Sequence, residues 1–356
     1  MSQIKTLNNL FFPKVNTVET KTKTSTFTST SFLASMQSVI QSKVSTLKTS
    51  TATTVTTVTD EPTQYSMTLR ADKQLSVPHL LQGNKECGHA ALAMALKYTS
   101  QQTNTPSLDP GNFHAWSPFD DVGHGPLNLQ SIASQKGAMT RMVNGGTDAD
   151  LAALIDKGLP PIVLGINGGA IGSSSISISN IIDNASRAHW MTVTGYVKND
   201  RGQITHFYIN DPNRTSDWRC PVADFHTFWD KNIIPGGNRF YMTIAKPGSF
   251  QASFLQTFLP QNKLSDSFRI KLKAVDALEK MYYQVREAGG DAYAAAKKLS
   301  AKIEALIKKG GSNLAQEIDK AFNEVFNAVI DALHALADAA EDVGDEIADW
   351  VGGLFG

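Results

Sequence analysis

Residues 81–91 read LQGNKECGHAA, and this run decides the fold expected for the middle of the chain. Cys87 stands at the start of an Ala-rich apolar run, GHAALAMALKYT at 88–99, which predicts a buried helix. A thiol at a helix N-terminus lies near free N–H groups and the positive end of the helix dipole, and both favour the thiolate. Gly88 would leave room beside the sulfur for a substrate backbone. The run therefore predicts a reactive cysteine, and the alternative is a buried structural cysteine at a helix start.

Gln82 lies five residues before the cysteine. Its side-chain amide could donate a hydrogen bond to an oxyanion, together with the backbone N–H of Cys87. This spacing favours the reactive cysteine over the structural one.

A nucleophilic thiol needs a base, and the base needs an orienting group. Residues 189–196, HWMTVTGY, alternate in the manner of a strand, which would hold the imidazole of His189 rigidly. The next predicted strand, at 203–210, ends in Asn-Asp-Pro at 210–212. An acceptor there could bond the far ring nitrogen of His189, and Asp211 is the first choice with Asn210 second. A core histidine and a plain turn after the strand are the alternatives.

The order of predicted elements indicates an α+β fold. Helices are expected at 88–99, 128–136 and 148–157, the last capped by Thr147 or Asp148. Strands are expected at 161–166, 189–196, 203–210 and 240–245. A helical part is thus followed by an antiparallel sheet.

Three motifs in order resemble one protein family. Gln82-x4-Cys87-Gly88, His189-Trp-x4-Gly-Tyr and the Asn-Asp-Pro at 210–212 are similar to the motifs of the C39 and C39-like cysteine peptidases, in the papain-like superfamily. The first motif also has Val-Pro at 77–78 before it and Ala-Ala at 90–91 after it. The resemblance covers about residues 76–245.

The resemblance implies a papain-like core, in which the helix that carries the cysteine packs on an antiparallel sheet. It implies Cys87 as nucleophile, His189 as base, Asp211 as orienting residue and Gln82 at the oxyanion hole, with no cofactor. Members of the family include leader peptidases that cut after Gly-Gly. No transporter or ATPase region is recognised in this sequence, so a dedicated export peptidase is not expected.

Both ends of the chain differ in composition from its middle. Residues 20–60 contain 22 Ser or Thr in 41 positions, so residues 1–70 are expected to be largely disordered. Residues 71–250 are expected to form the peptidase domain. Residues 264–356 predict a separate helical bundle, with helices at about 266–288, 291–309 and 313–351 broken at Gly pairs.

Charge is unevenly shared within this predicted bundle. Residues 265–310 carry ten Lys or Arg against six acids, whereas residues 321–351 carry eight acids and no Lys or Arg. The simplest interpretation is that the basic and acidic helices pack against each other. A module that binds a partner or a membrane is the alternative, although an acidic polar face disfavours adsorption to anionic membranes.

Bulk properties exclude several classes of protein. The chain has 356 residues and a formal net charge of zero, so no overall field directs it to nucleic acid. Two cysteines make no disulfide framework. No apolar run reaches 18 residues, and the apolar run at 10–12 is too short for a signal peptide core. We therefore expect a protein that is cytoplasmic in its producer, or exported to a target cell without a cleaved signal peptide.

These observations predict a cysteine endopeptidase with a Cys-His-Asp triad, acting as a bacterial secreted effector or toxin. Deamidation, transglutamination and acyl transfer are alternatives, since all proceed through a thioester. The expected partner is a protein or peptide substrate, and an immunity protein or a chaperone could bind the C-terminal helices.

Other polar residues carry weaker signals. His114, His124 and the Asp pair at 120–121 match no zinc spacing, so they are interpreted as loop residues and no metal is expected. Cys220 is expected to be structural, and Trp190 to pack over the catalytic pair. The Gly/Ser-rich insert at 167–179 is either a lid over the site or a solvated loop.

Overall fold

The structure, a computed structural model, describes residues 72–116, 123–167 and 177–355, with side chains as far as residue 337. The expected disordered segment at 1–70, Asp120, Asp121 and most of the 167–179 insert lie outside these residues. Residues 67–356 belong to one compact unit. The expected peptidase part and the C-terminal helices are therefore described together.

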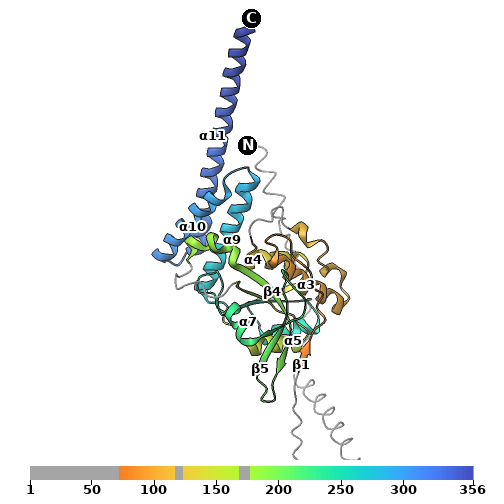
Figure 1. Cartoon of the computed structure of the whole chain (residues 1–356). Helices are drawn as coiled ribbons and strands as arrows, with labels where there is room; N and C mark the ends of the chain where they lie inside the picture. Colours follow the sequence, from red (N-terminus) through yellow and green to blue (C-terminus); the bar gives the residue numbers. More distant parts are fainter. Residues whose placement is uncertain (1–71, 117–122, 168–176, 356) are drawn as a thin grey trace, which may run out of the picture. The chain divides into compact units, whose positions relative to one another are not determined.

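The described strands form a seven-stranded antiparallel sheet (Figure 1). Its order is β2 (Met139–Val143), β7 (Phe240–Ala245), β3 (Ile162–Ile166), β4 (Ala188–Lys198), β5 (Ile204–Asn210) and β6 (Trp218–Pro221). The short strand β1 (Asp72–Gln74) pairs with the second half of β4. β4 therefore lies at the centre, between β3 and β1 on one edge and β5 on the other.

Six helices accompany this sheet before the C-terminal region. They are α3 (Cys87–Thr103), α4 (Pro126–Gln135), α5 (Asp148–Asp156), α6 (Ile181–Asn184), α7 (Val222–Trp229) and α8 (Phe250–Phe258). Thr147 caps α5 through a capping box with Asp150, as one of the two expected caps. The expected α+β class is confirmed, and the four expected strands are present as β3, β4, β5 and β7.

Strands β2 and β6 and helices α7 and α8 have no counterpart in the sequence-based expectations. Each spans nine residues or fewer, so the periodic pattern is too short to identify. Their existence depends on pairing and packing with elements distant in sequence, such as β2 with β7.

Alternate residues of the central strands enter two different hydrophobic clusters. Leu164, Trp190 and Phe240 face the cluster that contains much of α3, whereas Val163 and Met191 face the cluster of α5 and α7. This is the two-residue period of a sheet that is covered on both faces. The helix that carries Cys87 is held on β4 by a hydrogen bond of 3.2 Å from Thr192 Oγ1 to the Ala91 carbonyl.

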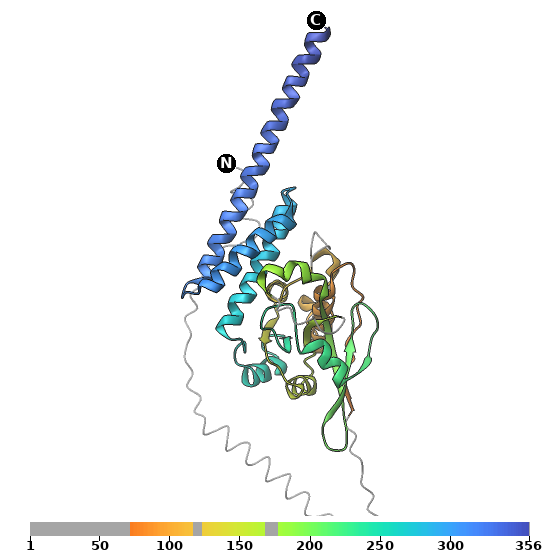
Figure 2. The ribbon, with the colours of Figure 1, turned by 60° about the vertical axis from the view of Figure 1, so that its left-hand side comes forward.

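The C-terminal region is helical, as expected. It consists of α9 (Asp266–Glu287), α10 (Ala292–Lys309) and α11 (Leu314–Phe355), and the ribbon shows α11 as one long helix (Figure 2). The side chains of Ser265 and Asp291 cap α9 and α10. None of the described helices is both long and apolar enough to cross a membrane.

Two features describe how these helices pack. Lys273 of α9 contacts Asp319 of α11 at 2.8 Å, and Lys302 of α10 pairs with Glu324, so basic and acidic helices do meet. Leu278 of α9 belongs to the same hydrophobic cluster as Trp190 of β4. The apolar side of the bundle therefore packs on the sheet-containing core.

The core leaves no space at one position of β3. A Cβ on Gly165 would lie 2.4 Å from the backbone oxygen of Phe228. We expect Gly165→Ala to lower the free energy of unfolding by about 1–3 kcal/mol, because overpacking a core forces the backbone apart. Urea unfolding would measure this, with Gly123→Ala as control, since a Cβ there meets no atom within 4 Å. Equal stability of the two variants would contradict the packing described here.

Candidate active site

Cys87 is the first residue of α3, at the point where the helix N–H groups have no intrahelical partners. Its thiol is free and its side chain is buried, with 7% of the residue exposed. The helix start thus holds the sulfur at a fixed position below the surface.

His189 is the second residue of β4 and lies opposite Gly165 of β3. Its Nε2 is 2.8 Å from Oδ1 of Asp211, the residue that follows β5. Both side chains are buried. Because Nε2 is engaged by the carboxylate, Nδ1 remains for the hydrogen bond that His189 shares with Cys87. The structure thus brings the three residues together in the order Asp211, His189, Cys87.

The charges of this group follow from burial and from mutual contact. Burial lowers the pKa of His189, but its hydrogen bonds to Asp211 and Cys87 outweigh burial and raise the pKa to about 9. Burial raises the pKa of Asp211, yet the bond to His189 and the backbone N–H of Asn213 give a net lowering. The imidazole is therefore held protonated against an ionised carboxylate.

The segment before Cys87 is joined to the segment that carries Asp211. The backbone N–H of Gln82 donates to the Pro212 carbonyl at 2.9 Å, and His79 Nε2 donates to the Asp211 carbonyl at 2.9 Å. The side chain of Asn210 donates to the Val77 carbonyl instead of approaching His189. Of the two orienting residues considered from the sequence, the structure thus brings only Asp211 to the imidazole.

Gln82 lies next to the triad through this backbone bond. Its side-chain Oε1 is buried without a hydrogen-bond partner among the described residues. Its role at an oxyanion hole stays a prediction.

Sequence reasoning overlooked Glu86, the N-cap of α3 and the neighbour of Cys87. Its Oε2 accepts from the Gly83 N–H at 2.7 Å and contacts His114 Nδ1 at 2.6 Å. These contacts shape the loop between Gln82 and Cys87. The N-cap position was the available signal, since acidic side chains are common there.

The structure gives Gly88 a different role from the one expected. A Cβ at this position would lie 3.1 Å from Trp190 Cδ1 and 3.2 Å from Leu129 Cδ1, so the space is filled by buried side chains. Gly88 thus allows α3 to approach β4 closely, and the expectation of room for a substrate backbone is wrong. Trp190 itself is buried and donates from Nε1 to the His124 carbonyl at 3.0 Å.

His89, two residues after the nucleophile candidate, is buried and stacks on His124 with ring centroids 3.5 Å apart. Burial and the neighbouring His124 lower the pKa of His89 to about 2, so this ring is neutral. His124 is therefore more than a loop residue, since it also contacts Glu279 Oε1 of α9 at 3.4 Å.

The remaining candidates lie away from this group. Cys220 is buried in β6, and burial together with Asp224 raises its pKa to about 12, as befits a structural thiol. His226 of α7 contacts Asp148 at 2.8 Å. Among the described residues no three His, Cys, Asp or Glu side chains are grouped as metal ligands.

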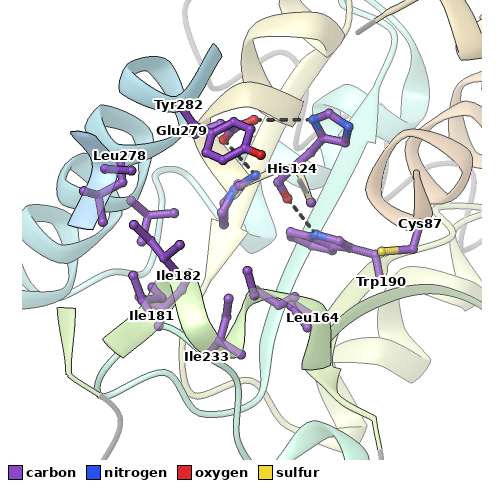
Figure 3. Close-up of a pocket in the computed structure, with 18 residues that line it drawn as sticks. Cys87, His124, Leu164, Ile181, Ile182, Trp190, Ile233, Leu278, Glu279 and Tyr282 are labelled. Carbon is purple, nitrogen blue, oxygen red and sulfur yellow. Dashed lines mark hydrogen bonds and ion pairs between the residues drawn. The ribbon is translucent and has the colours of Figure 1, made fainter. Parts of the chain in front are cut away.

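A pocket lies beside Cys87 (Figure 3). Cys87, Ala188 and Trp190 contribute to it from α3 and β4, and its wall continues over α6 and the C-terminal helix α9. The close-up shows Glu279 joined to His124 at one side of the pocket, with Ile181 and Ile182 on another.

Comparisons with known proteins identify the middle segment. Residues 74–232 match the model of the Peptidase_C39 like family. No curated protein matches the chain.

Similar solved structures have low sequence identity. They include a protein described as a C39-like peptidase from Bacillus anthracis, at 15% identity and a TM-score of 0.38, covering 50% of this chain and 100% of that one. A double glycine motif protease from an AMS/PCAT transporter, in complex with its leader peptide, has 19% identity and a TM-score of 0.32, covering 48% and 93%. The peptidase domain of Streptococcus ComA has 18% identity and a TM-score of 0.32, covering 48% and 98%.

Asp211→Asn tests the electrostatics of the His189 pair. Removing the carboxylate charge should lower the pKa of His189 from about 9 by about one unit or more. Because the folded pKa is raised above 6.5, the stability it contributes is complete below pH 6.5 and is lost as pH rises through about 9. The stability advantage of the native chain over Asp211→Asn should therefore shrink across that range.

NMR titration of the His189 ring and unfolding at several pH values would measure both effects. Asp148→Asn is the control, since that carboxylate contacts His226 instead. An unchanged His189 titration in Asp211→Asn would contradict the assignment.

Proposed function

We propose, from the premise that residues 74–232 belong to the C39-like family of cysteine peptidases, that this protein is an endopeptidase with Cys87 as nucleophile. His189 acts as the base and Asp211 orients it. The observation that carries the proposal is the buried contact of His189 with Asp211 at 2.8 Å, together with its hydrogen bond to Cys87.

The chemistry follows from these positions. His189 Nδ1 takes the thiol proton as the sulfur of Cys87 bonds to the carbonyl carbon of the scissile peptide. The oxyanion receives hydrogen bonds from the Cys87 N–H and the Gln82 amide. The imidazolium then gives its proton to the leaving amine, and the C–N bond breaks to leave a thioester.

Hydrolysis of the thioester uses the same residues. His189 takes a proton from water, the resulting hydroxide adds to the thioester carbon, and the carboxylic acid leaves as the sulfur regains a proton. Asp211 stays ionised and stabilises the imidazolium formed in each half of the cycle. If an amine other than water attacked the thioester, the same residues would perform acyl transfer.

Cys87→Ala should abolish turnover, because no other group on this chain is proposed to form the thioester. Cys220→Ala is the matched control and should retain activity, since Cys220 lies buried in β6. Cleavage of a proteome-derived peptide library, read by mass spectrometry, would measure both. Full activity in Cys87→Ala would refute the mechanism. A gain of about one dalton on a glutamine-containing product, without cleavage, would identify deamidation instead.

The biological setting proposed here is that of a secreted bacterial effector or toxin. It is supported by the Ser/Thr-rich segment at 20–60, which resembles export signals of such proteins, and by the appended helices. The protein would be cytoplasmic in its producer and exported without a cleaved signal peptide. An immunity protein or chaperone would bind the C-terminal helices.

Growth of bacterial or eukaryotic cells that express the full chain would test this setting. Expression should inhibit growth, and Cys87→Ala should restore growth at an equal protein level. Inhibition that persists in Cys87→Ala would mean that toxicity, if any, comes from another part of the chain.

A further inference from the structure

We propose that the pocket beside Cys87 binds a large apolar side chain of the peptide substrate, and that the appended helix α9 determines its selectivity. The inference rests on the proposed function, because it assigns a subsite to that enzyme. α9 (Asp266–Glu287) lies outside the segment 74–232 that matches the peptidase family. This chain has therefore added a wall to its site from a region that the family model does not include.

The pocket adjoins the reacting atoms. Cys87 is one of its lining residues, and so are Ala188 and Trp190, which flank His189 on β4. A side chain seated there would belong to a residue close to the scissile bond.

The walls of the pocket are mostly aliphatic. Leu164 of β3, Ile181 and Ile182 of α6, and Ile233 and Ile234 before β7 all line it. Apolar surface of this kind gains free energy by excluding water, and it offers little to a charged side chain. The ligand class that fits is a leucine, methionine or phenylalanine side chain.

α9 supplies one side of the pocket through residues on a single helix face. Val275, Leu278 and Tyr282 line it, at positions i, i+3 and i+7 of the helix. Lys280 of the same helix is exposed, does not line the pocket and pairs with Asp276 at 2.8 Å. A matched control position is thus available on the same element.

Buried polar contacts hold α9 against the core at the edge of the pocket. Glu279 Oε2 accepts from the Gly125 N–H at 2.9 Å, and Oε1 lies 3.4 Å from His124 Nδ1. A Cβ on Gly125 would come within 3.0 Å of Glu279 Oε2 and 3.1 Å of Val275 Cγ1, so the helix lies directly on this loop.

Helix α10 holds the opposite wall. Lys297 contacts Asp183 of α6 at 2.6 Å, and Tyr293 donates to the same carboxylate at 2.5 Å. Glu304 accepts from the Ile178 N–H at 2.9 Å, just before α6. Both walls are therefore fixed by the C-terminal helices, and the pocket is formed before a ligand arrives, which lowers the ordering cost of binding.

Alkylating probes test the pocket on the full-length protein without knowledge of the substrate. Iodoacetamide and N-(3-methylbutyl)iodoacetamide both form a C–S bond with Cys87 and release iodide, and they differ only in an apolar group. The ratio of their rate constants at Cys87, measured by mass spectrometry, reports on the pocket. In the native chain the apolar probe should react about tenfold faster, a preference typical of apolar pockets.

Leu278→Phe should remove most of this preference by filling the pocket, while leaving the iodoacetamide rate unchanged. Leu278→Ala should extend the preference to a larger N-(2-phenylethyl) probe. Lys280→Ala should behave as the native chain. A ratio near one in the native chain, or equal ratios in Leu278→Phe and Lys280→Ala, would overturn the inference while leaving the proposed function intact.

The iodoacetamide rate separates the two failures. Cys87 should react with iodoacetamide much faster than Cys220 in every variant, which also shows that the site has folded. If Cys87 reacted no faster than Cys220, the proposed function would fail, and the pocket inference with it.

Discussion

The buried hydrogen bond between His189 and Asp211 is the interaction on which the arrangement of the site depends. It requires β4 and β5 to pair in one register, in which Thr192 lies opposite Asn210 and Asp211 follows directly. A slip of one residue would turn His189 to the other face of the sheet, because side chains alternate along a strand. The alternating burial on the central strands opposes such a slip, so the hydrophobic core holds the polar pair in place.

The position of the sulfur depends on a second constraint, the close approach of α3 to β4. Gly88 allows contact with Trp190, and Thr192 donates to the Ala91 carbonyl. The backbone bond from Gln82 to Pro212 then closes the segment before Cys87 over the segment that carries Asp211. Since each of these contacts joins parts of the chain far apart in sequence, the site forms only when the domain has folded.

The C-terminal helices are joined to this arrangement by buried polar contacts as well as by apolar packing. Glu279 on α9 and Glu304 on α10 each accept a backbone N–H from a loop that borders the pocket. Burial raises the pKa of Glu279, while His124 and the Gly125 N–H act in the opposite direction. An unpaired buried carboxyl is costly, so the helix and the loop stabilise each other's position.

The sequence by itself determined the mixed helix and sheet class, the long C-terminal helices and the candidates Cys87, His189 and Asp211, because these depend on local periodicity and on motifs in a set order. Only the tertiary structure decided between Asp211 and Asn210 as the neighbour of His189, and it alone revealed the packing role of Gly88. It also decided that α9 completes a pocket beside Cys87. The physical reason is that side-chain direction and contact between distant segments are set by packing, and neither is encoded in a local pattern.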